Sequence, residues 1–108
     1  MINSLKKLFG FGPEVNYADL IQKGAIVVDV RSKDEYSNGH VNGSINIPVG
    51  SLSNNLAQLT DKSKTIITCC ASGVRSASAK NILKSNGYTS VFNGGGWNSL
   101  NTKIKKQS

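Results

Sequence analysis

The sequence predicts an α/β fold: a small open parallel sheet, of about four or five strands, flanked by helices on both faces. Two observations support this prediction. Short β-branched and apolar runs bounded by Gly, Pro, Asn or Ser recur along the chain, and helical patterns lie between them. The length of 108 residues suits one domain, which can bury a core without disulfides or metal.

Four apolar runs predict the strands. They cover residues 26–30, 44–47, 65–69 and 90–93. Each run is short and mostly apolar on both faces, which is typical of strands buried in a parallel sheet. Pro48 follows the second run directly and should end it, because proline cannot donate to the ladder of a central strand.

Four further stretches predict helices that alternate with these strands. They cover residues 17–23, 53–59, 74–85 and the segment from Trp97 onward. Asn16 is the expected N-cap of the first helix. The Asn86-Gly87 pair should terminate the third helix. A chain that alternates strands and helices in this way favours parallel pairing.

Composition separates the two ends of the chain from the part between them. Residues 1–14 are an expected N-terminal extension, residues 15–101 the folded domain and residues 102–108 a basic C-terminal tail. The formal net charge is +7, and lysines near both ends supply most of it. This pattern favours solvated ends and a positive field that attracts small anions. It does not favour nucleic acid, because no binding motif or interleaved aromatic residues accompany the charge.

The apolar runs are too short to indicate a membrane or an export signal. None approaches the roughly 20 residues that span a bilayer. The apolar stretch after Lys7 is shorter than the roughly 7–15 residues of a secretory signal. We therefore expect a cytoplasmic protein without a membrane partner, either a monomer or a weak dimer.

The two cysteines, Cys69 and Cys70, are neighbours at the end of the third predicted strand. A disulfide between neighbours is badly strained, and no Cys/His cluster has zinc spacing, so we expect no metal. Side chains alternate across a strand, so one thiol should face the core and the other the loop. Cys69 is then a small core residue, whereas Cys70 is either core or a reactive group.

The loop after Cys70 favours the reactive interpretation. If residues 71–74 curl over the sulfur, backbone N–H groups and the N-terminus of the 74–85 helix point at it and favour a thiolate. Gly73 allows the curl, and Arg75 adds a full positive charge. This arrangement suits a sulfur nucleophile and an anionic substrate. The expected substrate-binding residues are Ala71, Ser72, Gly73, Val74, Arg75 and Arg31.

Two arginines, Arg31 and Arg75, have alternative roles, and two further residues, Asp29 and Ser76, are expected behind the site. Asp29 and Arg31 end the first strand. Either they are structural, in an ion pair with Glu35 or a bond to a loop amide, or Arg31 lines the substrate mouth. Arg75 either binds the anionic donor or braces the loop by reaching Asp29 or Glu35. Ser76, also behind the site, should use its hydroxyl at the start of the helix.

Three segments carry a resemblance to a known family. Residues 29–48 read DVRSKDEYSNGHVNGSINIP, residues 69–83 read CCASGVRSASAKNIL, and residues 87–100 read GYTSVFNGGGWNSL. In this order and spacing they resemble the rhodanese-like sulfurtransferase domains in their single-domain form, over about residues 15–101. The resemblance places the nucleophile at Cys70, because Gly73 and Arg75 set the register.

The resemblance implies a rhodanese-like fold and a persulfide cycle. Cys70 would take sulfur from a small anionic donor such as thiosulfate and pass it to a thiol, a protein or cyanide, without a cofactor. The loop from Cys70 to Arg75 has six residues, C-x4-R, and in this length it resembles the loop of this family. The loops of cysteine phosphatases and arsenate reductases resemble C-x5-R, which is one residue longer. A non-catalytic interaction module is the other alternative, although such modules commonly lack the cysteine.

Overall fold

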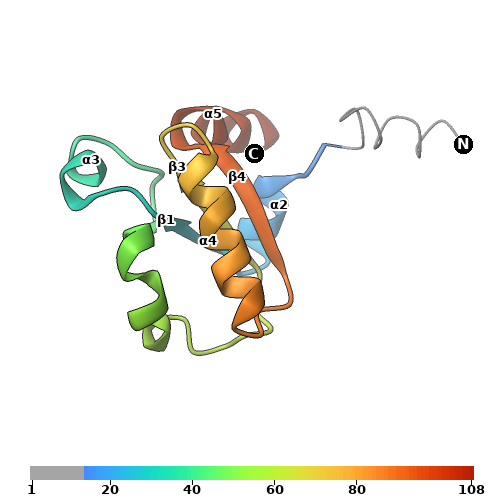
Figure 1. The fold of residues 1–108 in the computed structure, drawn as a ribbon. Helices are drawn as coiled ribbons and strands as arrows, with labels where there is room; N and C mark the ends of the chain where they lie inside the picture. The colour runs from blue at the N-terminus through green and yellow to red at the C-terminus, as the bar shows by residue number, and fades with distance from the viewer. Residues whose placement is uncertain (1–13) are drawn as a thin grey trace, which may run out of the picture.

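The computed structural model describes residues 14–108, so the expected N-terminal extension lies almost wholly outside the described residues. The sheet has four strands in the order β2-β1-β3-β4, and every neighbouring pair is parallel (Figure 1). The strands are β1 (Ile26–Asp29), β2 (Ile45–Asn46), β3 (Ile66–Cys70) and β4 (Val91–Gly96). The prediction of a small parallel α/β sheet is confirmed.

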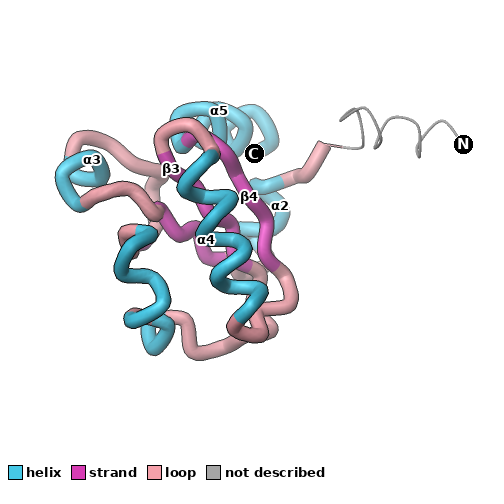
Figure 2. Tube along the Cα trace, in the orientation of Figure 1, coloured by secondary structure: helices cyan, strands magenta, loops and turns pink. Residues whose placement is uncertain are grey.

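Helical segments cover both faces of this sheet (Figure 2). They are α2 (Tyr17–Gln22), α3 (Lys33–Ser37), the 3-10 segments η1 (Val49–Asn54) and η2 (Leu56–Gln58), α4 (Val74–Ser85) and α5 (Trp97–Gln107). One core cluster packs the sheet against η1 and α4, through Leu52 and Leu83. The other packs it against α2 and α5, through Tyr17 and Leu100. All five residues of β3 are buried between these two layers.

The helix predicted at 53–59 is wrong in type and extent. Residues 49–58 form two 3-10 segments instead. Ser and Asn side chains here compete with helical backbone bonds, and the Asn55 side-chain amide donates to Ser51 O at 2.7 Å. The α3 helix was not predicted, although Ser32 and Glu35 form the capping box that starts it.

Strand β4 extends through three glycines to Gly96, beyond the predicted end at residue 93. A Cβ at Gly94 would lie 2.9 Å from Thr68 O, and a Cβ at Gly96 would lie 2.9 Å from Ala71 O. The absence of side chains therefore lets β4 approach the end of β3 and the loop that follows it. Cys70 pairs in register with Gly96.

Helix α5 runs to Gln107, so that most of the segment expected as a basic tail is helical. The Gln107 side chain joins this helix to the start of the described chain. Its amide nitrogen donates to Val15 O at 2.9 Å, and its oxygen accepts from Ala18 N at 3.2 Å. Within residues 14–108, no helix has the length and apolar character needed to cross a bilayer.

Candidate active site

The Cys70 side chain lies at the end of β3, beneath the loop that leads into α4. Cys69 packs into the core on the α2 and α5 side, whereas Cys70 belongs to the core on the α4 side. Both thiols are free, and 0% of Cys69 and 1% of Cys70 is exposed. The prediction that the two side chains face opposite sides of the sheet is confirmed.

Two backbone amides donate to the Cys70 sulfur. The Gly73 nitrogen lies 2.9 Å from Sγ, and the nitrogen of Ser76, in the first turn of α4, lies 3.3 Å from it. Gly73 has a φ of 100°, in the left-handed region that residues with a Cβ rarely adopt. The loop therefore turns its N–H groups inward around the sulfur.

The outer side of this loop is open to solvent. Ala71 and Ser72 are exposed. Val74 is 73% exposed and is the exposed large hydrophobic residue of the described chain, residues 14–108. Three of the expected substrate-binding residues thus form the solvent-facing rim above Cys70.

The environment of Cys70 separates it chemically from Cys69. Burial alone raises the pKa of the Cys70 thiol, but the Ser76 hydroxyl and the amides of Ser76, Gly73 and Ser72 lower it, and the net pKa is lowered. Burial raises the pKa of Cys69 to about 12, and the charge of Asp29 adds to this increase. Cys70 is therefore the thiol that is predisposed to ionise.

The buried Ser76 and the half-buried Asn93 form a polar network behind the sulfur. The Ser76 hydroxyl oxygen lies 3.4 Å from Cys70 Sγ, and it donates to Asn93 Oδ1 at 2.6 Å. Asn93, on β4, also accepts from Gly95 N at 2.9 Å and donates to Gly73 O at 3.3 Å. Asn93 was not predicted from the sequence, where its one signal is a polar residue at the end of an apolar run.

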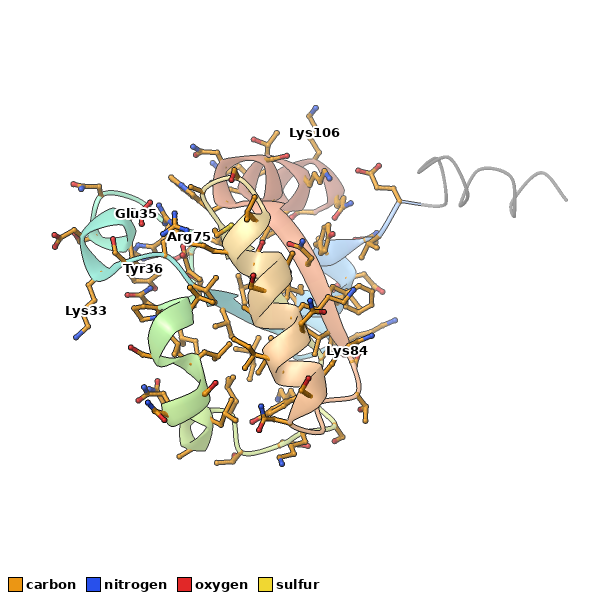
Figure 3. The ribbon with its side chains drawn as sticks, viewed as in Figure 1. Lys33, Glu35, Tyr36, Arg75, Lys84 and Lys106 are labelled. Atoms are coloured by element: carbon orange, nitrogen blue, oxygen red, sulfur yellow. The ribbon has the colours of Figure 1, made fainter. Side chains whose placement is uncertain are left out.

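Arg75 braces the loop by an ion pair with Glu35. Its guanidinium nitrogens donate to the two Glu35 carboxylate oxygens at 2.7 and 2.9 Å, and Figure 3 shows the two side chains meeting between α4 and α3. Attraction to Cys70 raises the pKa of Arg75 less than the Glu35 hydrogen bond does. Of the two roles left open for Arg75, this geometry favours the brace.

The ion pair between Arg75 and Glu35 should make the free energy of unfolding depend on pH in the acidic range. The hydrogen bond from Arg75, followed by those from Ser32, lowers the pKa of Glu35 from 4.5 to about 2. Because the folded-state pKa is the lower one, this contribution is present above about pH 4.5 and is lost as the pH falls towards 2. Glu35→Gln should therefore destabilise the protein near neutral pH, and this loss should shrink towards about pH 3.

Urea unfolding of wild type and Glu35→Gln at the two pH values measures this difference. Glu14→Gln, at an exposed position, is the matched control and should show little loss at either pH. A Glu35→Gln loss that stays constant between the two pH values would contradict the brace.

Arg31 does not line the substrate mouth, contrary to one expectation. Its side chain is 5% exposed and its guanidinium donates to the fully buried Asp29 at 2.7 Å. It also donates to Glu35 O at 3.3 Å and Gly39 O at 2.7 Å, and it lies 4.8 Å from the centre of the Trp97 ring. The structural alternative therefore holds, but Asp29 and Arg31 pair with each other, whereas the expected partners were Glu35 or a loop amide. Of these, the Arg31 backbone N–H does donate to Asp29 Oδ1, at 3.0 Å. Both residues support the loop between β1 and β2.

A comparison with family models identifies the chain. The model described as "Rhodanese-like domain" matches residues 14–103. The chain belongs to the rhodanese-like family. This match covers the sheet, both helical layers and the Cys70 loop, and it agrees with the resemblance expected from the motifs.

Several relatives of this rhodanese-like domain are sulfurtransferases. The thiosulfate sulfurtransferase PspE of Escherichia coli is 41% identical over 70 residues, which cover 64% of this chain and 67% of the relative. A tRNA sulfurtransferase of Thermoplasma acidophilum is 33% identical over 72 residues, but the match covers 67% of this chain and only 14% of that longer protein.

Solved structures show the same fold. A rhodanese with anions from E. coli superposes with a TM-score of 0.67 and 36% identity, over 70% of this chain and 91% of that chain. A human single-domain sulfurtransferase gives a TM-score of 0.69 at 26% identity, over 85% of this chain and 92% of that chain.

His40 is held by contacts with Tyr36 of α3. His40 Nδ1 lies 2.7 Å from Tyr36 O, and its ring stacks on Tyr36 with 3.7 Å between centroids. His40 is thus a strut of the loop after α3. Among residues 14–108, no three His, Cys, Asp or Glu side chains converge in a way that could hold a metal ion.

Proposed function

We propose that this rhodanese-like domain carries sulfane sulfur on Cys70, from a small anionic donor such as thiosulfate to a thiophilic acceptor. The observation that supports this most directly is the set of donors around Sγ. The Gly73 and Ser76 amides donate to the sulfur, and the pKa of Cys70 is lowered despite its burial. A stabilised thiolate at a solvent-facing loop is a nucleophile for sulfur. The sulfurtransferase relatives support the same class of reaction.

Sulfur transfer on Cys70 has two steps. In the first, the Cys70 thiolate attacks the outer sulfur of thiosulfate, the S–S bond of the donor breaks, and sulfite leaves with the bonding electron pair. Cys70 then carries a persulfide whose negative charge lies on the outer sulfur. In the second step, cyanide, a thiol or a protein thiolate attacks that outer sulfur, and the electron pair of the broken bond returns to Sγ. Neither step consumes a redox cofactor.

The loop residues divide into two roles in this proposal. Ala71, Ser72 and Val74, on the exposed rim, are where donor and acceptor meet the sulfur. Gly73 and Arg75 hold the loop in shape, the first through its left-handed backbone and the second through Glu35. The donor is thus bound mainly by N–H groups and the helix terminus.

A cysteine phosphatase or arsenate reductase fits this loop less well. Such sites resemble C-x5-R, whereas Cys70 and Arg75 are separated by four residues. Both oxygens of Glu35 already accept from the Arg75 guanidinium. A tetrahedral oxyanion would therefore lack both the longer loop and a free arginine. The non-catalytic alternative leaves the lowered pKa of Cys70 without a role.

Intact mass after exposure to thiosulfate tests the proposal. We expect wild type to gain the mass of one sulfur atom, and cyanide or a thiol reductant to remove it. The Cys70→Ser protein is the control and should gain nothing. A wild-type mass that stays unchanged in excess thiosulfate, with the protein folded and the thiol reduced, would contradict the sulfur-carrier function.

A further inference from the structure

The hydroxyl of Ser76 has more acceptors than hydrogens. Its oxygen lies 2.6 Å from Asn93 Oδ1 and 3.1 Å from Gly73 O, to either of which it can donate, and it accepts from the Cys70 thiol at 3.4 Å. Once Cys70 is a thiolate, Sγ becomes a third acceptor for this hydroxyl. A serine hydroxyl has one hydrogen, so it can donate fully to one of these atoms at a time. Ser76 is fully buried, so the direction of this hydrogen is decided by protein atoms.

The Asn93 amide is oriented by its other two hydrogen bonds. The Gly95 N–H donates to Oδ1 at 2.9 Å, which makes this atom an acceptor, and Nδ2 donates to Gly73 O at 3.3 Å. With this orientation, Oδ1 is the short-range acceptor for the Ser76 hydroxyl. Gly73 O is a weaker competitor for the Ser76 hydrogen, because that carbonyl already accepts from Asn93 Nδ2.

We propose that Asn93 is a positioning residue that lets the Ser76 hydroxyl follow the charge on the Cys70 sulfur. While Sγ is uncharged, as a thiol or within a persulfide, the hydroxyl donates to Asn93 Oδ1. When Sγ is a thiolate, the hydroxyl rotates and donates to the sulfur, because a charged acceptor binds the hydrogen more strongly than a neutral amide. Asn93 thus acts through Ser76 and does not touch the reacting sulfur.

This inference rests on the proposed sulfur transfer and assigns the hydroxyl a part in both steps. As thiosulfate donates its outer sulfur, Sγ loses its charge and the hydroxyl turns to Asn93. As the acceptor removes that sulfur, the electron pair returns to Sγ and the hydroxyl turns back to stabilise it. Only a hydrogen bond moves, and Ser76 keeps its proton throughout.

The pH midpoint of Cys70 alkylation by iodoacetamide tests the switch without requiring sulfur transfer. All variants carry Cys69→Ser so that one thiol reports. Without the competing acceptor, the hydroxyl stays on the thiolate, so Asn93→Ala should lower the midpoint by about 0.5 unit. Asn93→Asp, which keeps the shape of the side chain, should raise the midpoint because a carboxylate holds the hydroxyl more firmly and adds negative charge.

The decisive measurement repeats Asn93→Ala in a Ser76→Ala background, where its effect on the midpoint should vanish. The charged or titratable groups on the surrounding elements stay unchanged across the series: Arg75 on α4, Glu35 on α3, and Asp29 with Arg31 at the end of β1. Thermal melts confirm that each variant is folded.

Two outcomes would overturn the switch. If Asn93 only supports the loop, its removal should misalign the amides and raise the midpoint, whether or not Ser76 is present. Equal shifts in the two backgrounds would likewise show that Asn93 does not act through Ser76. The proposed function is tested separately: it fails if wild type gains no sulfur mass. If wild type gains that mass but the Asn93→Ala shift is the same with and without Ser76, only the switch is overturned.

Discussion

Replacing Cys70 with serine is expected to abolish transfer of sulfur from thiosulfate to cyanide, with a loss of at least about 10³-fold. Serine has no sulfur to form a persulfide, and its hydroxyl does not ionise near neutral pH. The Gly73 and Ser76 amides would still point into the site, but towards a neutral oxygen. Initial rates of thiocyanate formation measure this loss directly.

Cys69→Ser is the matched control, one residue away in the same strand. Cys69 faces the opposite core, and burial raises its pKa to about 12, so it supplies no thiolate near neutral pH. We expect activity to remain, with a loss of stability of about 1–3 kcal/mol because a buried hydroxyl replaces a small apolar group. An inactive Cys69→Ser protein beside an active Cys70→Ser protein would show that the assigned register is wrong.

Replacing Asp29 with alanine is expected to have the largest effect on stability. Asp29 is fully buried, and its carboxylate accepts from the guanidinium of Arg31. Arg31 is also buried, with 4% of the residue exposed. Removing the carboxylate leaves Arg31 with an uncompensated charge in the core. Breaking a buried pair in this way costs about 3–5 kcal/mol. Urea unfolding followed by circular dichroism measures the change.

The exposed pair Asp19–Lys23 is the control for this prediction. Its nitrogen and oxygen lie 3.0 Å apart, but the side chains are 47% and 73% exposed. Asp19→Ala should therefore cost less than about 1 kcal/mol. Similar losses for Asp29→Ala and Asp19→Ala would mean that burial of the Asp29–Arg31 pair does not govern its contribution.

Local patterns were sufficient to predict much of this fold. The apolar runs predicted all four strands to within a few residues. Such a run must be buried whichever strands pair with it, so the run alone marks the strand. The 74–85 helix begins at Val74 and ends at Ser85, as predicted. The predictions failed in two of the expected elements. Residues 49–58 became 3-10 segments, where Ser and Asn side chains compete for backbone hydrogen bonds. Strand β4 continued through its glycines, which let it pack closely against Thr68.

The sequence by itself determined the family and the parallel sheet, and it predicted that Cys69 and Cys70 face opposite sides of that sheet. Each of these depends on local information: motif spacing, the alternation of side chains along one strand, and a glycine before a helix. These features lie in short continuous segments, such as residues 29–48, 69–83 and 87–100, and in the order of those segments along the chain. They can therefore be predicted without knowing which segments meet in space.

Only the tertiary structure decided the partners of the charged and polar groups around the loop. Arg75 pairs with Glu35, 40 positions away, and Ser76 reaches Asn93, 17 positions away. Arg31 could have faced solvent or Asp29, and its burial beside Trp97 depends on where α5 packs. A side chain with several acceptable partners takes the one that the fold brings within hydrogen-bond distance, and no local pattern contains that distance.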